Sequence, residues 1–395
     1  MDIIEYIHFV TELTNEITSL RRDFHKHAES AWTEFRTTAV IAEILENAGF
    51  RVKIGKSIHS DSRYNLPCSD TLDKMLLRAN SEGAPAKYLD KKKAGFTELI
   101  AEIGEGKPIT ALRMDIDAMP FAESQDEGYS CYDGGYSSIH QDGCHSCGHD
   151  AHAAILVGVG KVLSRYQNEI KGTIRLIAQP GEEGVAGGIS LVNAGAVEGA
   201  SAIYGAHMDN SLDTGTIAFT KSGWAASHKF NIKLTGQSAH SGGHPELGNN
   251  CILASANIIQ NFYAMPRHSE GYTRINIGTI EAGTARNSIA PYSFMRAETR
   301  AENQKIEDEL FERAQKIVSN SAQIYGCNYY IEIAGLATTA AFTEEDISSM
   351  KKILAELEPL NISPEYNYGS GGCEDFSCFV RKVQENGGKA GHLRI

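Results

Sequence analysis

The sequence has no apolar run of the roughly 18 residues that a membrane-spanning helix needs. Its first residues, MDIIEYIHFVTELTNE, carry acids where a secretory signal peptide would carry bases. We therefore expect a cytoplasmic protein that does not enter a membrane. Basic residues are also scarce, since 37 Lys and Arg stand against 50 Asp and Glu and give a formal net charge of -13. Lysine and arginine do not gather into a long basic stretch, so we expect no nucleic-acid partner.

Cysteine is too sparse for a disulfide scaffold. Eight cysteines are scattered over 395 residues, whereas domains that depend on disulfides are short and dense in cysteine. Cys144 and Cys147 form the one CxxC pair of the sequence, so a structural zinc site with four thiolates would lack half of its ligands. We expect most thiols to be reduced. The sequence also lacks internal repeats and low-complexity segments, and its length suits two domains or one large domain with an insertion.

Alternating strands and helices predict an α/β domain with a mainly parallel sheet. We expect buried strands at 109–117, 172–183 and 201–209. A helix is predicted from His149 to about Arg165, because its apolar residues share one face. In parallel sheets, ligands and functional groups gather beyond the carboxyl ends of the strands. The candidates at such ends are Asp115, Asp117, Glu182, Glu183 and His207.

Two other regions have patterns of their own. Residues 11–50 predict two helices, the second from about Glu34 to Ala48, and the polar stretch from about 55 to 95 is expected to be irregular. Residues 224–336 predict strands and helices in the β-α-β-β-α-β order of a ferredoxin-like unit, inserted into the α/β domain. The predicted domains are 1–223, 224–336 and 337–395. The first and third of these segments would form one domain.

The segment HSCGHDAH at 145–152 places one thiol and three imidazoles within eight positions. Thiolate and imidazole bind transition metals, but histidines also cap helices, and free cysteines pack as small apolar groups. Cys147 and His149 fall at the start of the predicted helix. Together with Glu183 and His207 they would form a ligand set suited to zinc, with manganese as the alternative. Two ions fit if one ligand bridges them.

Adjacent Glu182 and Glu183 need different roles, because neighbouring side chains on an extended segment point in opposite directions. One can bind metal while the other takes the proton from an attacking water, which is the chemistry of amide hydrolysis. The alternative is a solvated turn after a strand. Asp117 suits an acceptor that orients a ligand histidine, whereas Asp115 is ambiguous, and either can instead cap a turn. His152 is expected to pack or to support a ligand.

Two segments of the inserted unit carry further candidates. The glycine-rich loop GQSAHSGGHPE holds His240 and His244, and an imidazole near a developing oxyanion would stabilise it. The segment GTARNSIAP offers Arg286 and Asn287, a forked donor and an amide suited to a substrate carboxylate. A surface loop and an ordinary turn between strands are the alternatives.

The chain resembles the co-catalytic metallocarboxypeptidase and amidohydrolase family, which includes aminoacylases, hippurate hydrolases and auxin-conjugate hydrolases. The motifs that carry the resemblance are, in order, CHSCGHDAHA, QPGEEG, the strand-terminal His207, GQSAHSG and GTARNSIAP. The resemblance covers nearly the whole chain. Residues 21–37, 55–98 and 268–278 look most like the branch of the family that acts on aminobenzoyl-glutamate.

The resemblance implies a hydrolase that cleaves the amide bond of an N-acyl or N-aroyl amino acid, and most specifically p-aminobenzoyl-glutamate, with release of glutamate. It implies two divalent metal ions, Zn²⁺ or Mn²⁺, with Cys147 able to bridge them. The implied metal ligands are Cys147, His149, Glu183 and His207. Glu182 would be the general base, and Asp117 would support a ligand.

The same resemblance implies that the inserted unit is a lid that also forms a dimer interface. His240 would reach into the partner's active site and stabilise the tetrahedral intermediate. Arg286 and Asn287 would hold the carboxylate of the released amino acid. The assembly would be a homodimer or a heteromer with a related subunit.

Two departures from the family pattern bear on these expectations. Relatives have a further ligand histidine near the C-terminus, followed by an acidic, aromatic stretch and a final helix, whereas this sequence ends in GHLRI. We expect a missing strand and helix and a weakened or empty metal position, with His392 as the candidate replacement. Gly372-Cys373 also stands where relatives have Gly-Ser. The alternative function is a truncated, catalytically impaired structural subunit that pairs with an intact partner through residues 224–336.

Overall fold

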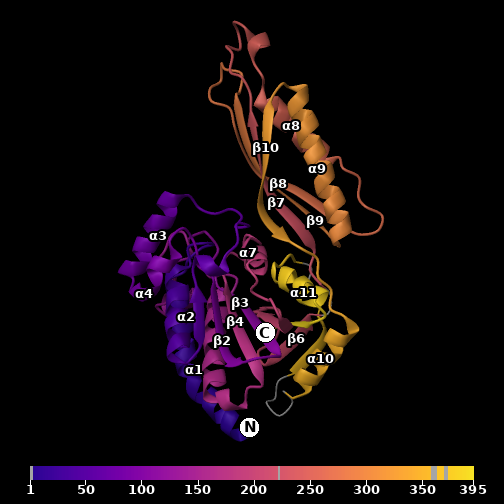
Figure 1. Ribbon diagram of the computed structural model, residues 1–395. Helices are drawn as coiled ribbons and strands as arrows, with labels where there is room; N and C mark the ends of the chain where they lie inside the picture. The colour runs from indigo at the N-terminus through magenta and orange to yellow at the C-terminus, as the bar shows by residue number, and fades with distance from the viewer. Residues whose placement is uncertain (1–2, 221–222, 357–362, 369–371) are drawn as a thin grey trace. The chain divides into compact units, whose positions relative to one another are not determined.

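The computed structural model describes residues 3–220, 223–356, 363–368 and 372–395. The chain divides into two compact units (Figure 1). Unit 1 consists of Met1–Gly223, Ala340–Ser370 and Asp375–Ile395, and unit 2 of Trp224–Thr339 and Gly371–Glu374. The hydrolase and lid roles assigned to the segments 1–223, 224–336 and 337–395 stay predictions. Across the described ranges, no helix combines the length and the apolar character that crossing a bilayer would require.

Unit 1 is built on one eight-stranded sheet. Its strands are β1 Arg51–Ile54, β2 Leu99–Glu105, β3 Ile109–Asp115, β4 Gly172–Gln179, β5 Ala200–His207, β6 Thr216–Thr220, β11 Ser363–Tyr368 and β12 Lys389–Arg394. Their order in the sheet is β1-β2-β4-β3-β5-β12-β6-β11. The neighbours β4, β3, β5 and β12 run parallel, whereas β2 and β6 are antiparallel to β4 and β12. The predicted α/β class with a mainly parallel sheet is therefore confirmed, with antiparallel strands added on both sides of the parallel centre.

The helices of unit 1 are α1 Ile3–Lys26, α2 Phe35–Asn47, α3 Ser69–Ser81, α4 Ala86–Leu89, α5 Ser130–Asp133, α6 His149–Arg165, α7 Gly187–Asn193, α10 Glu344–Ala355 and α11 Phe376–Glu385, with short 3-10 turns η1 Lys56–Ile58, η2 Asp90–Lys92 and η3 Gln167–Glu169. The prediction for α6 is confirmed. The expectation of an irregular stretch at 55–95 is wrong, because it contains α3 and α4. Leu72, Met75 and Ala79 of α3 are buried at helical spacing, but charged neighbours mask this pattern in the sequence.

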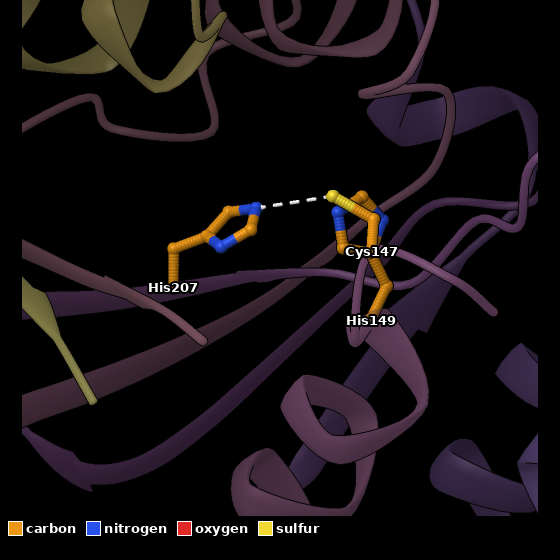
Figure 2. A group of neighbouring side chains, drawn as sticks. All are labelled: Cys147, His149 and His207. Carbon is orange, nitrogen blue, oxygen red and sulfur yellow. Dashed lines mark hydrogen bonds between the residues drawn. The ribbon is translucent and has the colours of Figure 1, made fainter. Parts of the chain in front are cut away.

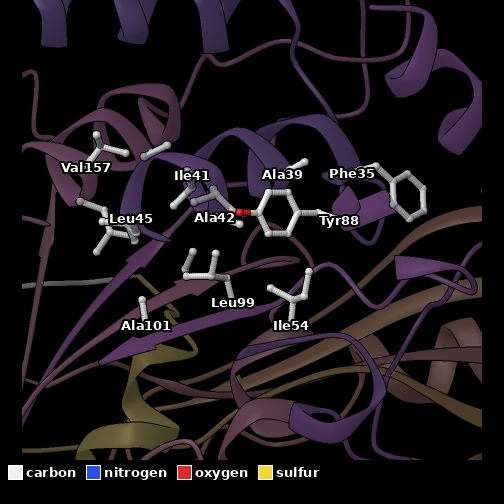
Figure 3. Close-up of a cluster of buried hydrophobic side chains, with 14 of the residues drawn as sticks. Phe35, Ala39, Ile41, Ala42, Leu45, Ile54, Tyr88, Leu99, Ala101 and Val157 are labelled. Carbon is white, nitrogen blue, oxygen red and sulfur yellow. The ribbon is translucent and has the colours of Figure 1, made fainter. Parts of the chain in front are cut away.

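The main core of unit 1 lies between the sheet and the helices α2 and α6. Figure 3 shows Ile41, Ala42 and Leu45 of α2 facing Leu99 and Ala101 of β2, and all five side chains are buried. Strand residues alternate between the two faces of a sheet, so every second residue of a strand can join this core. The remaining strand residues face the other side of the sheet, where α11 packs against β5 and β12.

This alternation places polar residues of β3 on the face opposite the main core. Leu112 and Met114 pack against the core. Arg113 and Asp115 alternate with them and are hydrogen bonded to each other. Arg113 also binds Asp375, the residue that precedes α11. The face of the sheet beneath α11 is therefore polar next to the end of β3.

Unit 2 consists of strands β7 Ala226–Thr235, β8 Thr273–Ala282, β9 Tyr292–Ala301 and β10 Asn328–Ala337, helices α8 Cys251–Tyr263 and α9 Gln304–Ile324, and the 3-10 turn η4 Pro245–Leu247. Along the chain the elements follow the predicted order of strand, helix, two strands, helix and strand. The strands form an antiparallel sheet of order β10-β7-β9-β8. Its core includes Phe230, Phe262 and Phe311, and joins the sheet to both helices. That this unit acts as a lid and dimer interface stays a prediction.

The packing of α2 against α6 predicts a large cost for truncating Leu45. Leu45 is fully buried, and a Cβ added at Gly160 of α6 would lie 2.3 Å from Leu45 Cδ2, so the contact is close. We expect Leu45→Ala to lower the free energy of unfolding by about 2–5 kcal/mol. Leu77→Ala is the control, because Leu77 on α3 is 70% exposed. Urea unfolding followed by circular dichroism should show a change of at most about 0.5 kcal/mol for the control; equal losses in both variants would contradict this packing.

Candidate metal centre

The candidate residues of unit 1 meet at the carboxyl ends of three strands. Asp115 is the last residue of β3, Glu182 follows β4 by three residues, and His207 is the last residue of β5. Because β3, β4 and β5 are parallel neighbours, these ends lie at one edge of the sheet. His149 is the first residue of α6, and the preceding turn carries Cys147 to the same edge.

Gly148 allows the chain to turn sharply between Cys147 and His149. Its φ is 91°, in the left-handed region where a side chain is strained. An added Cβ would also lie 3.0 Å from the Cβ of Met208, so the turn approaches the end of β5 closely. Figure 2 shows the result, with the His207 ring directed at the Cys147 thiol and the His149 ring beside that thiol.

Two overlapping groups of donor atoms lie at this edge. The donor atoms of Cys147, His149 and His207 lie within 4.8 Å of one another, and Cys147 Sγ is 3.5 Å from His207 Nε2. His149, Glu182 and Glu183 form the other group. His149 Nε2 lies 3.9 Å from Glu182 Oε2 and 4.0 Å from Glu183 Oε1. Since His149 belongs to both groups, the structure brings together all five residues that the sequence singled out as ligands and general base.

Asp117 holds His149 and the glutamate pair through different atoms. Its carbonyl oxygen accepts a hydrogen bond from His149 Nδ1 at 2.9 Å. Its carboxylate accepts the backbone N–H groups of Glu182 at 2.9 Å and Glu183 at 3.1 Å. A carbonyl can only accept, so Nδ1 carries a proton and Nε2 is the nitrogen that faces the donor cluster. His149 Nε2 is buried and has no hydrogen-bond partner in the described part of the chain, which is the arrangement of a ligand histidine.

The surroundings of this cluster favour a positive charge. Burial lowers the pKa of His149, but the carboxylates of Asp115 and Asp117 outweigh it and hold that pKa well above its usual value. Burial raises the pKa of the Cys147 thiol, but the neighbouring imidazoles of His149 and His207 hold that pKa below its usual value. A readily formed thiolate, carboxylates and imidazoles in one acidic cluster are a donor set that fits a divalent transition metal.

His152 has both ring nitrogens engaged beside this cluster. Its Nε2 accepts the backbone N–H of Met208 at 2.8 Å, so Nδ1 must donate its proton to the carboxylate of Asp115. The other oxygen of Asp115 lies 3.8 Å from His149 Nε2. His152 therefore holds both Asp115 and Met208, the first residue after β5. The sequence left the role of Asp115 ambiguous, and in the structure this carboxylate faces the candidate ligand His149.

A buried guanidinium next to the cluster joins three segments of the chain. Arg113 donates hydrogen bonds to Gln179 at 2.7 Å and to Asp115 and Asp375 at 3.0 Å, and all four side chains are buried. These residues come from β3, from the end of β4 and from the start of α11. No local sequence pattern predicts this network, because Arg113 and Asp375 lie 262 positions apart.

A second buried polar network lies on the other side of the α6 N-terminus. The two ring nitrogens of His25 are each 2.8 Å from a carboxylate, of Asp150 and of Glu123, and Arg21 Nε is 2.6 Å from Asp150. Burial lowers the pKa of His25, but the two carboxylates raise that pKa above its usual value. Sequence analysis missed this network as well. The signal that could have found it is the four-residue spacing of Arg21 and His25, which share one face of a helix.

A cavity of about 1000 Å³ opens at the donor cluster. Cys147 and His207 line it, together with His145, Arg21 and Arg394. A cavity of this size is large enough for a small organic molecule, since ligand pockets typically measure about 300–1000 Å³. The described donor cluster is therefore accessible to a substrate from one side.

His240, Arg286 and Asn287 lie in two neighbouring loops of unit 2. His240 forms an isolated β-bridge with Ser288, and the carbonyl of Asn287 accepts the N–H of Ser241 at 3.1 Å. Arg286 and Asn287 are exposed. The structure thus brings these three candidates together within unit 2. Their roles at a partner's active site and at a substrate carboxylate stay predictions.

His392, the candidate replacement for a C-terminal ligand, lies within the sheet of unit 1. It is a residue of β12 and pairs with Gly205 of β5, two residues before His207. The ring is fully buried, its Nδ1 is 3.1 Å from Thr220 Oγ1, and its centroid is 5.4 Å from that of Phe376. The structure thus places it one strand away from His207, and its role as a metal ligand stays a prediction.

Comparisons with known proteins identify relatives over nearly the whole chain. The sequence profile of peptidase family M20/M25/M40 matches residues 111–388. Two similar proteins are a subunit of the p-aminobenzoyl-glutamate hydrolase of Escherichia coli and the indole-3-acetyl-aspartic acid hydrolase of Enterobacter agglomerans. Each is 33% identical over 388 residues, which are 98% of this chain and 89% of the relative. The solved structure of the aminobenzoyl-glutamate utilization protein from Klebsiella pneumoniae is 32% identical with a TM-score of 0.86, and the match covers 100% of this chain and 93% of that one.

The Arg113 network predicts that removal of its cation destabilises unit 1. Arg113→Met would leave two buried carboxylates without their positive partner, so we expect a loss of about 3–5 kcal/mol in the free energy of unfolding. Arg165→Met is the matched control, since Arg165 pairs with Glu5 at 3.1 Å near the surface. Its expected loss is below about 1 kcal/mol. Chemical unfolding of both variants measures the difference, and a loss for Arg113→Met no greater than that of the control would refute the structural role.

Proposed function

This chain belongs to peptidase family M20/M25/M40, and we propose that it is a metal-dependent amidohydrolase that cleaves the amide bond of an N-acyl or N-aroyl amino acid. The observation that carries the proposal is the meeting of the predicted ligands at one sheet edge, together with Glu182. The proposed ligands are Cys147, His149, Glu183 and His207. An enzyme of this kind needs such a cluster beside a cavity, and the cavity at Cys147 meets that need.

We propose two divalent metal ions as the cofactor, Zn²⁺ or Mn²⁺. The thiolate and imidazole donors favour zinc, and the carboxylates are compatible with manganese. Cys147 would be shared between the ions, because its sulfur lies 3.5 Å from His207 Nε2 and within 4.8 Å of a ring nitrogen of His149. His149, His207 and Glu183 would supply the other ligands.

In the proposed reaction, water attacks the amide carbonyl of the substrate. The bound ions would polarise that carbonyl and lower the pKa of the water. Glu182 would take the proton from the water and pass it to the leaving nitrogen. The hydrogen bond from the Glu182 backbone N–H to Asp117 supports this assignment, because it fixes the main chain of the base beside His149. Burial of Glu182 in the wall of the cluster would keep bulk water from competing for the proton.

The names of the relatives support a narrower substrate class. Both p-aminobenzoyl-glutamate and indole-3-acetyl-aspartic acid join an aromatic acyl group to an acidic amino acid. We propose an N-acyl acidic amino acid as the substrate and p-aminobenzoyl-glutamate, which yields p-aminobenzoate and glutamate, as the first compound to test. Arg286 and Asn287 would hold the carboxylate of the released amino acid, and His240 would stabilise the tetrahedral intermediate in the partner subunit.

The proposed assembly is a heteromer with a related subunit or a homodimer. The name of the Escherichia coli relative, which describes one subunit of a hydrolase, supports the heteromer. The proposed location is the cytoplasm. All eight cysteines are free thiols, and the buried pair Cys251 and Cys327 remains unbonded with its sulfurs 3.6 Å apart. Eight cysteines in 395 residues are also far fewer than small secreted domains use to build disulfide scaffolds, which supports this location.

Replacement of the proposed base separates chemistry from metal binding. We expect Glu182→Gln to lower kcat for p-aminobenzoyl-glutamate by about 10²–10⁴-fold, because the amide cannot take a proton. The metal content of this variant, measured by plasma mass spectrometry, should equal that of the wild type. Glu105→Gln at the exposed end of β2 is the control and should leave both quantities unchanged. Hydrolysis that persists in the Glu182 variant would overturn the assignment.

Removal and return of metal tests the proposed cofactor. Dialysis against a chelator should abolish hydrolysis, and added Zn²⁺ or Mn²⁺ should restore it with about two ions bound per chain. Cys147→Ala should lower the number of bound ions, since it removes the shared ligand. An inactive protein with one ion or none in the wild type would instead favour the impaired structural subunit.

A further inference from the structure

Arg21 lines the cavity at the donor cluster and has an unused hydrogen-bonding edge. Its Nε is 2.6 Å from Asp150, and its guanidinium carbon lies 5.6 Å from the centroid of the Tyr136 ring. The two terminal nitrogens make no hydrogen bond to any described residue, and the side chain is 34% exposed. Arg21 lines the same cavity as Cys147 and His207. A planar guanidinium in this state offers a forked donor to a carboxylate.

Buried contacts hold this guanidinium in place. Asp150, which binds Arg21, is fully buried and also bound to His25. The second nitrogen of His25 is bound to Glu123, and Glu123 in turn accepts the hydroxyl of Tyr129 at 2.9 Å. Each side chain of this hydrogen-bonded chain is held by the next one, so the Asp150 carboxylate has little freedom to rotate. The conformational entropy of the Arg21 guanidinium is therefore lost when the protein folds and not when a ligand binds.

His145 supplies a second, independent sign of a ligand. Its side chain is only 4% exposed, and it lines the cavity together with Arg21. Neither of its ring nitrogens finds a hydrogen-bond partner among the described residues. Buried polar groups are rarely left without a partner, because each one costs the desolvation of that group. A polar ligand in the cavity would supply the missing partner.

We propose that Arg21 and His145 form a subsite that binds the side-chain carboxylate of an acidic amino acid in the substrate. The proposal rests on the proposed hydrolase function and adds the residues that would select for charge. Two carboxylates, Asp209 and Asp213, also line the cavity and would repel an anion elsewhere along its wall. Positive charge in this lining comes from Arg21 and Arg394, so an anion is favoured beside these two residues. The acyl group of the substrate, which has no charge to match, would occupy the rest of the cavity.

A pair of substrates that differ in one charge tests the subsite. Wild-type protein should prefer p-aminobenzoyl-glutamate to p-aminobenzoyl-glutamine, because the glutamine side chain has the same shape without the charge. Arg21→Gln should lower kcat/KM for the glutamate substrate by about 10–100-fold and for the glutamine substrate by no more than about twofold. An equal loss for both substrates would overturn the proposal, since Arg21 would then act only through Asp150 and the neighbouring His149.

Arg22→Gln is the matched control. Arg22 also lies over the Tyr136 ring, at 5.0 Å, but it is exposed and is not part of the cavity lining. Both substrates should be hydrolysed by this variant as by the wild type. Arg21→Lys keeps the charge beside Asp150 but removes the fork, so it should retain the fold and show an intermediate loss of charge preference. His145→Phe should reduce the same preference. A full preference in both of these variants would contradict the subsite.

Binding measurements separate the subsite from the hydrolase function. Isothermal titration calorimetry with glutarate and glutaramate, which differ in one carboxylate, needs no turnover. We expect wild-type protein to bind glutarate more tightly, and Arg21→Gln to reduce that difference by about tenfold. If the wild type hydrolyses no amide but keeps this Arg21-dependent difference, the proposed function fails and the subsite stands. If it hydrolyses the amides without any Arg21-dependent preference, the subsite fails and the function stands.

Discussion

The structure around the candidate metal centre depends on the buried charge of Arg113. A guanidinium removed from water is costly unless opposite charges and hydrogen bonds surround it. Arg113 meets this requirement with the carboxylates of Asp115 and Asp375 and the amide of Gln179. The same contacts fix the ends of β3 and β4 and the start of α11 relative to one another. Asp115, once held by Arg113, is in position to bind His152 and to face His149.

The first turn of α6 joins the donor cluster on one side and the network of His25 and Arg21 on the other. Successive residues of a helix point about 100° apart, so His149 and Asp150 face different neighbours. His149 turns to the donor cluster with Cys147, whereas Asp150 turns to His25 and Arg21. The first turn of α6 therefore contributes to the donor cluster through His149 and to the proposed carboxylate subsite through Asp150, which binds Arg21.

Local sequence patterns predicted the parts of the fold and site that depend on neighbouring residues. The strands β3, β4 and β5 are short apolar runs that end in polar groups, and Cys147 and His149 stand almost side by side in the sequence. The helix α3 was missed, because its few buried residues stand among charged ones. The two buried polar networks were missed for a different reason. Their partners, such as Arg113 and Asp375, are joined only by tertiary packing, and no periodicity in the sequence reports such a pairing.

Asp117 anchors the ring of His149 with its carbonyl and the backbones of Glu182 and Glu183 with its carboxylate. Two proposed ligands, His149 and Glu183, and the proposed base Glu182 are thereby held by one residue. Hydrogen bonds within the protein therefore contribute to the spacing of these groups. Because Asp117 holds all three groups, its replacement would displace the proposed ligands and the proposed base together.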